Sequence, residues 1–391
     1  METANLEDLL HLVTNCLTTF NASDSQPDKD CTYGGLDDYL PAPTDHYTAF
    51  SLVMAVAMLI ICVSGMLANC ISIFIFTRHA LRNPTNLLLM GLSATDLVLL
   101  ALGIPSFAVP SFNVYMESPE LFQFNLYTTL YIYPLTMAAQ TCSVWLLVVA
   151  TAERYLAVCH PLLSLRIRTS ACIKSSLGCV FLGAVAYNVV RFFEYRLPSN
   201  GDTPLIAENQ LIADWRYYTI YYTSMFLVVH FGLPFTLLLT LNLLVLRAIQ
   251  VARRRRQSLT SRHERREHSR STMIMLVTCL FCLCYSLSLF VNVANVFSSK
   301  LFRNRSTIAF MLNDLSNLME MIYCSTTWII YYKFMAKYRI IFKHIFLCNI
   351  HAGAHSFYSS ENTERRSRPI SPLAVPPTAE DEGSPFFESA V

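Results

Sequence analysis

Charged side chains are scarce in this sequence: only 14% of its 391 residues are Asp, Glu, Lys or Arg, whereas 53% are hydrophobic. A soluble domain carries about a quarter charged residues, so this composition cannot cover a water-facing surface of ordinary area. The mean hydropathy of +0.39 agrees with that deficit. These values exclude collagen, a coiled coil and an ordinary soluble enzyme, and they predict that lipid forms part of the solvent.

Several other features are missing. The start of the chain, METANLEDLL, has neither a basic region nor an apolar core of the signal-peptide kind, so we expect no signal peptide. The sequence has no His-Glu-x-x-His motif, no paired nucleophile and base, and no internal repeat, which weighs against an intramembrane enzyme and a transporter. Most of the 13 cysteines lie in apolar runs, where a thiol behaves as a small hydrophobe. We therefore expect no cofactor, no metal site and no disulfide scaffold.

Seven apolar runs reach the length of about 20 residues that a helix needs to cross about 30 Å of hydrocarbon. Backbone groups in lipid must be satisfied within the segment, and the period of these runs is not that of barrel strands. We therefore predict an all-α membrane protein, a seven-transmembrane helix bundle. Its expected spans are Tyr47–Phe76, Pro84–Pro110, Phe122–Val158, Ser170–Val190, Arg216–Ile249, Ser271–Phe297 and Ser306–Tyr331.

The basic residues indicate which side of the membrane each loop occupies. With the N-terminus outside, 22 of the 29 Lys and Arg residues fall in cytoplasmic segments, as the positive-inside rule requires. The first 47 residues hold nine acids against the single base Lys29, and both glycosylation sequons, at Asn21 and Asn304, also fall outside. The run of arginines at 253–256 is interpreted as a membrane anchor and not as a nucleic-acid site. We predict a multi-pass protein of the plasma membrane with an extracellular N-terminus.

An amphipathic eighth helix is expected after the last span. Apolar residues recur there at helical spacing with basic residues between them, which is typical of a helix lying in the membrane interface. Cys348 at its end is a candidate for palmitoylation. The expected organisation is an acidic extracellular tail at 1–46, the helix bundle at 47–331, the amphipathic helix at 332–348 and a disordered cytoplasmic tail at 349–391.

The triplet Glu153-Arg154-Tyr155 ends the third span and leads into Val158-Cys159-His160-Pro161-Leu162. With these residues at this place among seven spans, the chain resembles the rhodopsin-like (class A) G-protein-coupled receptors. The stretch Tyr187-Asn188-Val189-Val190-Arg191-Phe192-Phe193-Glu194 makes it similar to FMRFamide-type invertebrate neuropeptide receptors within that family. The resemblance covers roughly Tyr47 to Cys348.

The resemblance implies a receptor that passes binding of an extracellular peptide to a heterotrimeric G protein. It also implies arrestin as a partner, and the terminus at Ser389 and Val391 resembles a ligand of PDZ proteins. Membrane lipid is a further partner, and no nucleic acid is expected. The resemblance assigns G-protein coupling and switching to Glu153, Arg154, Tyr155, Pro161, Leu162, Glu267, Asn69, Asp96, Val144, Pro234, Phe281 and Tyr331.

Glu267, at the inner end of the sixth span, is expected to pair with Arg154 and hold the resting state; the alternative is a solvated charge in an Arg-rich loop. Other positions depart from the family pattern. The sixth span has Leu287 where the family has a kinking proline, and Tyr323 and Thr327 replace two asparagines beside Asp96, which weighs against a sodium site. The family's extracellular disulfide is also missing, because Thr129 takes the helix position and 191–215 contains no cysteine.

The ligand pocket that the resemblance implies is lined by Tyr133, Gln140, Asn188, Arg191, Glu194, Tyr222, Asn292 and Glu320. Thr136 stands where amine receptors carry an aspartate, and the seventh span has no lysine for retinal, so neither ligand is expected. Glu320 could bind the arginine of an amidated Arg-Phe peptide. The competing interpretation is an internal pair of Glu320 or Glu194 with Arg191.

Two further alternatives remain open on the sequence alone. Tyr217, Tyr218, Tyr221 and Tyr222 form either an outer aromatic belt, which we favour, or a wall of the binding site. As to function, the alternatives to a peptide receptor are a rhodopsin-like receptor for a lipid or other small molecule and, from another class, a membrane transporter.

Overall fold

The structure is a computed structural model that describes residues 45–81, 83–167, 169–196, 207–208, 211, 214–255, 262–297 and 307–346. The chain divides into two compact units, Met1–Ile341 and Phe342–Val391. The elements discussed below belong to the first unit, apart from the last residues of α15. Several predicted sites lie outside the described residues, namely Asn21, Asn304, Cys348, Ser389, Val391 and the side chain of Glu267.

Helices make up nearly all of the described chain, as the apolar runs predict. The elements are α2 (Asp45–Phe76), η3 (His79–Leu81), α3 (Pro84–Gly103), η4 (Ile104–Ala108), α4 (Val109–Met116), α5 (Pro119–Tyr127), η5 (Thr128–Ile132), α6 (Tyr133–Cys159), α7 (Pro161–Ile167), α8 (Ser170–Asn188), η6 (Val189–Phe193), β1 (Tyr195–Arg196), β2 (Ala207–Glu208), α10 (Trp215–Tyr217), η7 (Tyr218–Met225), η8 (Leu227–Gly232), α11 (Leu233–Arg255), α12 (Arg262–Phe297), α14 (Thr307–Phe334) and α15 (Ala336–Phe346). The two short strands pair antiparallel, with Tyr195 opposite Glu208.

Six helical segments of the described chain are long and apolar enough to cross a membrane. They are His46–Phe76, Pro84–Met116, Pro119–Cys159, Ser170–Phe193, Tyr218–Val251 and Ser269–Ala294. The seventh predicted span corresponds to α14, which is 28 residues long and carries Asp314 and Glu320 within it. Acidic residues inside a spanning helix are costly in lipid and therefore face the bundle interior, and Glu320 is only 3% exposed.

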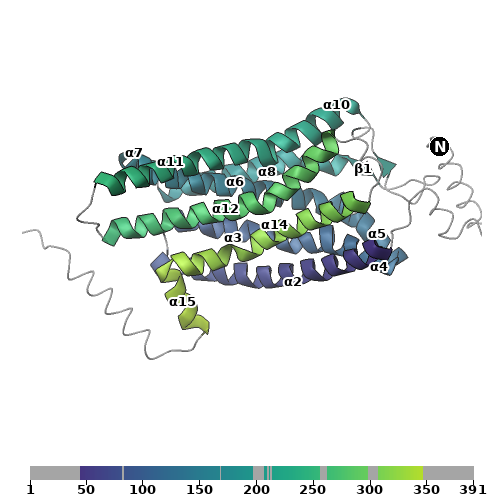
Figure 1. Cartoon of the computed structure of the whole chain (residues 1–391), viewed down its shortest axis with the longest axis horizontal. Helices are drawn as coiled ribbons and strands as arrows, with labels where there is room; N and C mark the ends of the chain where they lie inside the picture. Colours follow the sequence, from purple (N-terminus) through teal and green to yellow (C-terminus); the bar gives the residue numbers. More distant parts are fainter. Residues whose placement is uncertain are drawn as a thin grey trace, which may run out of the picture. The chain divides into compact units, whose positions relative to one another are not determined.

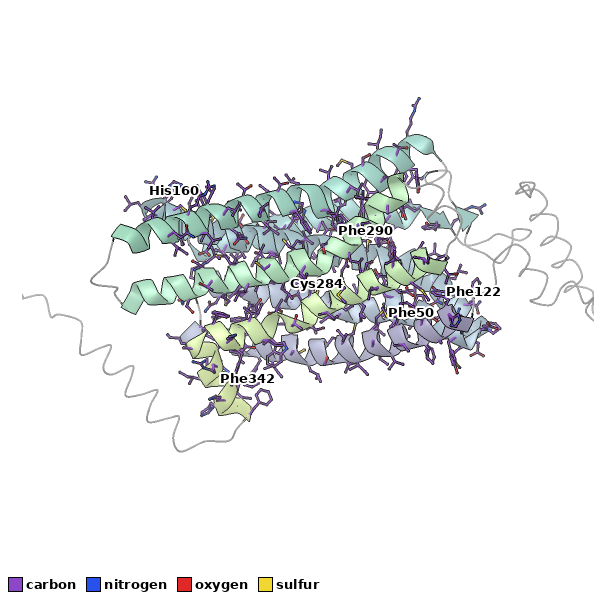
Figure 2. All side chains as sticks on the ribbon, in the orientation of Figure 1. Phe50, Phe122, His160, Cys284, Phe290 and Phe342 are labelled. Atoms are coloured by element: carbon purple, nitrogen blue, oxygen red, sulfur yellow. The ribbon has the colours of Figure 1, made fainter. Side chains whose placement is uncertain are left out.

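The long helices lie side by side, with α6 at the centre (Figure 1). Helix α6 contacts α3, α8, α11 and α12. In the spanning segment that contains α6, Pro119–Cys159, 67% of the most apolar 18-residue stretch is buried, whereas in Ser170–Phe193, which contains α8, only 17% is buried. Elements α4, α5, α10 and β1 gather at one end of the bundle, here called the β1 end, and α7 lies at the other, the α7 end (Figure 1). Figure 2 places Phe122 at the β1 end, His160 at the α7 end and Cys284 between them.

Prolines lie in or next to three of the four described π-helical segments, η4, η5 and η8, but not η7. A proline lacks the N–H donor and clashes with the carbonyl four residues earlier, so a helix around it needs local adjustment. Pro105 lies inside η4, η5 ends two residues before Pro134, and η8 ends two residues before Pro234. The wide turn in η8 also lets two consecutive side chains, His230 and Phe231, point into the bundle, where each is at most 1% exposed.

Helices α2 and α14 are held together by polar contacts at a point of close approach. Asn69 donates through Nδ2 to the carbonyls of Gly65 and Cys324, both at 3.0 Å, and Ser325 donates to the Ile61 carbonyl at 3.0 Å. Asn69 is fully buried, so these bonds satisfy its amide N–H donors where no water is available. Gly65 allows the contact, because a Cβ atom there would overlap Ser325 Oγ and lie 2.8 Å from Leu100 Cδ1.

We predict that Gly65→Ala lowers the stability of the protein in detergent by about 1–3 kcal/mol, the usual effect of overpacking, and reduces surface expression. Gly183→Ala is the matched control, because a Cβ atom at Gly183 meets no atom within 4 Å. Thermal unfolding of both variants in detergent gives the measurement. Equal melting temperatures for the two variants would show that the α2–α14 approach does not need a glycine.

Candidate functional site

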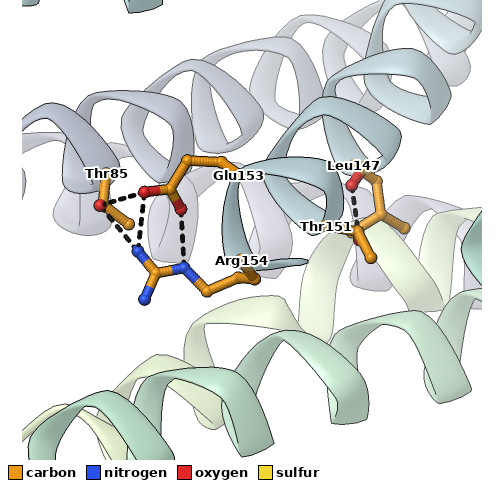
Figure 3. Close-up of polar contacts among 5 residues, drawn as sticks. All are labelled: Thr85, Leu147, Thr151, Glu153 and Arg154. Carbon is orange, nitrogen blue, oxygen red and sulfur yellow. Dashed lines mark hydrogen bonds and ion pairs between the residues drawn. The ribbon is translucent and has the colours of Figure 1, made fainter. Parts of the chain in front are cut away.

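A buried ionic cluster occupies the α7 end of α6 (Figure 3). Arg154 donates through Nε to Glu153 Oε2 at 2.7 Å and through Nη2 to Glu153 Oε1 at 3.0 Å. Its Nη2 also donates to Thr85 Oγ1 at 2.7 Å, and Thr85 in turn donates to Glu153 Oε1 at 2.9 Å. Arg154 is 1% exposed, and removing one partner of such a buried pair costs about 3–5 kcal/mol.

Two helices build this cluster. Glu153 and Arg154 come from the last turns of α6, and Thr85 comes from the first turn of α3, directly after Pro84 at the helix start. Neighbouring residues on a helix point in different directions. The side chains of Glu153 and Arg154 are long enough to bond to each other all the same, and both also bond to Thr85 of α3. Sequence reasoning identified Arg154 and Glu153 but missed Thr85, because a threonine after a proline carries no signal of its own.

Next to the cluster, the chain presents an exposed apolar surface. The Tyr155 hydroxyl and His160 Nε2 lie 3.2 Å apart, and their rings pack edge to face. Pro161 begins α7 and is exposed, and Leu162 is 84% exposed. A leucine so exposed at a helix end is available to a partner.

The middle of the bundle holds the residues that the resemblance assigns to switching. Ser143 of α6 donates to Asp96 Oδ1 of α3 at 2.7 Å, and both residues are fully buried. Phe281 packs against Phe235, Tyr285 and Tyr323, with ring centroids 5.4, 4.3 and 5.5 Å away. Three further predicted switch residues are also buried, namely Val144, Pro234 and Tyr331.

Toward the β1 end, α6 and α14 are joined by a carboxylate. Gln140 donates through Nε2 to Glu320 Oε2 at 2.7 Å, and both side chains are 3% exposed. Glu320 therefore has an amide partner, whereas the ion pair of Arg191 is with Glu194. Tyr133 and Tyr222 are half-buried, and Asn292 donates to the Ser288 carbonyl of its own helix at 2.8 Å.

Arg191 is a buried cation between α8 and the start of the fifth span. Its Nη1 lies 3.7 Å from Glu194 Oε1, and its guanidinium lies 5.5–5.7 Å from the ring centroids of Tyr221, Tyr222 and Phe226. Such cation–π contacts stabilise a desolvated guanidinium. The internal-pair interpretation is thus correct for Arg191 and Glu194.

Tyr217 completes this arrangement by donating to Glu194 Oε1 at 2.7 Å. Burial raises the pKa of the Glu194 carboxyl group above its usual value, and the hydrogen bond from Tyr217 and the charge of Arg191 partly offset that rise. Tyr218 is 51% exposed, so a place in an aromatic belt stays a prediction for it. The hydroxyls of Tyr217 and Tyr221 bond to Glu194 and to the Tyr187 carbonyl, and the Tyr222 ring lies beside Arg191, so these three tyrosines contact polar groups of the bundle instead.

A second polar group lies beside Arg191. Asn188 Nδ2 donates to Thr141 Oγ1 at 2.9 Å, and Thr141 Oγ1 lies 3.0 Å from His230 Nε2. His230 is 1% exposed and was missed by sequence reasoning. The sequence did offer a signal for His230: an ionisable residue within an apolar run of a spanning helix is a candidate functional residue.

Comparison with known proteins agrees with this geometry. Residues 68–337 match the family described as 7 transmembrane receptor (rhodopsin family). Over 293 residues the chain is 36% identical to FMRFamide peptide receptor frpr-18 of Caenorhabditis elegans, covering 73% of this chain and 67% of that protein. It is 33% identical to the FMRFamide receptor of Drosophila melanogaster over 82% of this chain but only 58% of that protein. It is 27% identical to human somatostatin receptor type 3, over 74% and 67% of the two chains.

The helical bundle with Glu153, Arg154 and Tyr155 at the end of its third span defines a G-protein-coupled receptor. This chain belongs to the rhodopsin family of seven-transmembrane receptors. It is a multi-pass membrane protein and a receptor, not an enzyme, and a G protein is its partner.

We predict that Thr85→Val raises basal nucleotide exchange on the G protein several-fold. The variant keeps the shape of the side chain but removes a bond that holds Arg154 and Glu153 against α3, and a buried bond of this kind is worth about 1–3 kcal/mol. Binding of a non-hydrolysable GTP analogue to membranes, without agonist, gives the measurement.

Thr151→Val is the matched control for this prediction. Thr151 is a fully buried threonine on α6, three residues before Arg154, and its hydroxyl donates to the Leu147 carbonyl of its own helix at 2.8 Å (Figure 3). It should leave basal exchange close to wild type. If both variants gave the wild-type rate, Thr85 would have no part in restraining Arg154.

Proposed function

We propose that this chain is a receptor for an amidated, FMRFamide-like neuropeptide, with its binding site between α6, α8, η8 and α14. The observation that carries the proposal is Glu320, a buried carboxylate whose hydrogen-bond partners, the Gln140 amide and the Ser288 hydroxyl, are both neutral. A carboxylate inside a bundle gains from a cationic partner, and the guanidinium of an Arg-Phe-amide peptide supplies one with a fork of N–H donors. The similarity to FMRFamide receptors supports the same ligand class.

We place the β1 end outside the cell and the α7 end in the cytosol, in the plasma membrane. This orientation puts 22 of the 29 Lys and Arg residues on the cytoplasmic side. It also presents the exposed Leu162 to a G protein, and the buried Arg154 cluster would become accessible when the inner ends of the spans separate.

The chain carries further sequence features outside the described residues. Asn21 and Asn304 are proposed glycosylation sites, and Cys348 is a proposed palmitoylation site at the end of the amphipathic helix. Arrestin is a proposed partner of the cytoplasmic tail, and Ser389 and Val391 are proposed to bind a PDZ protein. Lipid contacts with the amphipathic helix complete the set of partners.

We predict that Glu320→Gln weakens the response to an activating amidated Arg-Phe peptide by about 30-fold or more, since truncating one partner of a buried charge pair costs about 2–5 kcal/mol. The measurement is a calcium or cAMP assay on transfected cells challenged with a panel of amidated neuropeptides. Glu120→Gln, which removes an exposed acid from α5, controls for general electrostatic attraction. Unchanged peptide potency in Glu320→Gln would remove the proposed contact.

We also predict that Glu267→Ala raises basal signalling, because Glu267 lies near the cytoplasmic start of α12 and is proposed to pin that helix to Arg154 in the resting state. Glu264→Ala removes the same charge about one turn further from the membrane and serves as the control. Ligand-free G-protein activation is compared at equal surface expression. An identical basal level in all three proteins would argue for the solvated-charge alternative.

A further inference from the structure

Asp314 is a second carboxylate within α14, and it lies closer to the β1 end than Glu320 does. The two residues are six positions apart, about 9 Å along the helix axis, and Asp314 is the nearer to the helix start at Thr307. Glu320 bonds to Gln140 of α6, whereas Asp314 is hydrogen-bonded to Ser111 of α4. Because α4 lies at the β1 end of the bundle, Asp314 lies there too (Figure 1).

The Asp314 carboxylate is short of hydrogen-bond donors. Its Oδ2 atom is buried and has no hydrogen-bond partner among the described residues. The hydroxyl of Ser111 has a single hydrogen, and the Phe107 carbonyl, 3.0 Å from it, competes with the carboxylate for that hydrogen. Buried acceptors are nearly always satisfied in native proteins, so the free oxygen of Asp314 requires an explanation.

The helices around Asp314 supply no lysine or arginine to balance its charge. Elements α2, η4, α4 and α5 contain neither residue, and Lys333, the one lysine of α14, lies in the last turn at the opposite end of that helix. The next residue, Leu315, packs against an apolar cluster that includes Met54 and Leu318. A carboxylate at the edge of an apolar layer gains from a cation brought by a ligand.

Two aromatic side chains indicate which kind of cation fits. The charge of Asp314 reaches the phenol of Tyr47 on α2, and the Tyr47 ring lies 6.0 Å from that of Phe310, one turn before Asp314 on α14. Asp314 is partly exposed and Phe310 is 48% exposed, so a group arriving at the β1 end can reach them. An ammonium group donates to a carboxylate and is attracted to ring faces.

We propose that Asp314 binds the N-terminal ammonium group of the peptide ligand, with Tyr47 and Phe310 beside it. The inference rests on the proposed function, in which Glu320 binds the arginine of the same peptide. In FMRFamide the arginine is two residues from the ammonium group, about 7 Å of extended chain, and the arginine side chain adds its own length. This reach covers the separation of about 9 Å between the two carboxylates along α14.

The test compares FMRFamide with N-acetyl-FMRFamide, which lacks the ammonium charge but keeps every side chain and the C-terminal amide. Calcium response and competition binding are measured on the full-length receptor at equal surface expression. On the wild type, acetylation should lower the potency by about 10- to 100-fold, the range expected for loss of a hydrogen bond between charged groups.

Asp314→Asn removes the charge but keeps the shape of the side chain and an acceptor for Ser111. The variant should lower the potency of FMRFamide about as much as acetylation does. It should leave the potency of N-acetyl-FMRFamide at its wild-type value, so that the two changes together cost no more than either alone. A merely structural role of Asp314 would instead weaken both peptides equally.

Glu117→Gln is the matched control, because Glu117 is an exposed acid at the end of α4, also at the β1 end. It should keep the wild-type difference between the two peptides. Equal potency of the two peptides on the wild type, an equal loss of both in Asp314→Asn, or failure of FMRFamide to bind would refute the ammonium site while the peptide receptor stood. If no amidated peptide of the panel activated the wild type, the proposed function itself would fail.

Discussion

The interior of the bundle contains no bulk water, so a buried polar side chain is costly unless it finds a partner within the protein. Helix α6 carries several of the polar side chains that bond to neighbouring helices. Polar side chains of α6 form hydrogen bonds with α3 at two points along the helix, and with α14, α8 and η8. The bonded pairs are Arg154–Thr85, Ser143–Asp96, Gln140–Glu320, Thr141–Asn188 and Thr141–His230. A small rotation of α6 would break several of these bonds together. The polar groups therefore favour a few discrete arrangements of the helices over gradual deformation.

The sequence predicts most of the fold, because lipid leaves few options: long apolar runs must be helices, and the triplet at Arg154 fixes the place of the third span. It predicts less of the site. Thr85 joins Arg154 only through the tertiary approach of α3, and the direction of the Gln140 amide depends on Glu320, which is 180 residues away. The inward position of His230 depends on the widened turn in η8, and hydrophobic periodicity does not reveal such a turn.

The β1 end lacks the cysteines that would crosslink the third span to the following loop, with Thr129 at the helix position. Contacts around Arg191 connect the neighbouring elements instead: Glu194 pairs with it, and Tyr217 and Tyr221 tie the start of the fifth span to Glu194 and to the Tyr187 carbonyl. A disulfide acts mainly on the unfolded chain, whereas these contacts act only in the folded state and only while they are buried. The geometry of the binding end thus depends on the packing of the tyrosines around one guanidinium.

Signal transfer has to cover the distance from Gln140 to Arg154, 14 residues or about 21 Å along α6. Helix α14 offers a parallel route, because Tyr323 lies one turn from Glu320 and packs edge to face against Tyr285 and Phe281 of α12, with centroids 5.8 and 5.5 Å away. A shift of α14 at Glu320 would reach α12 through these ring contacts. Helix α12 is continuous from Arg262 to Phe297 and has no proline, so it has no hinge at which to bend. A push at Tyr285 would therefore tilt the helix as a rigid rod and displace its start at the α7 end.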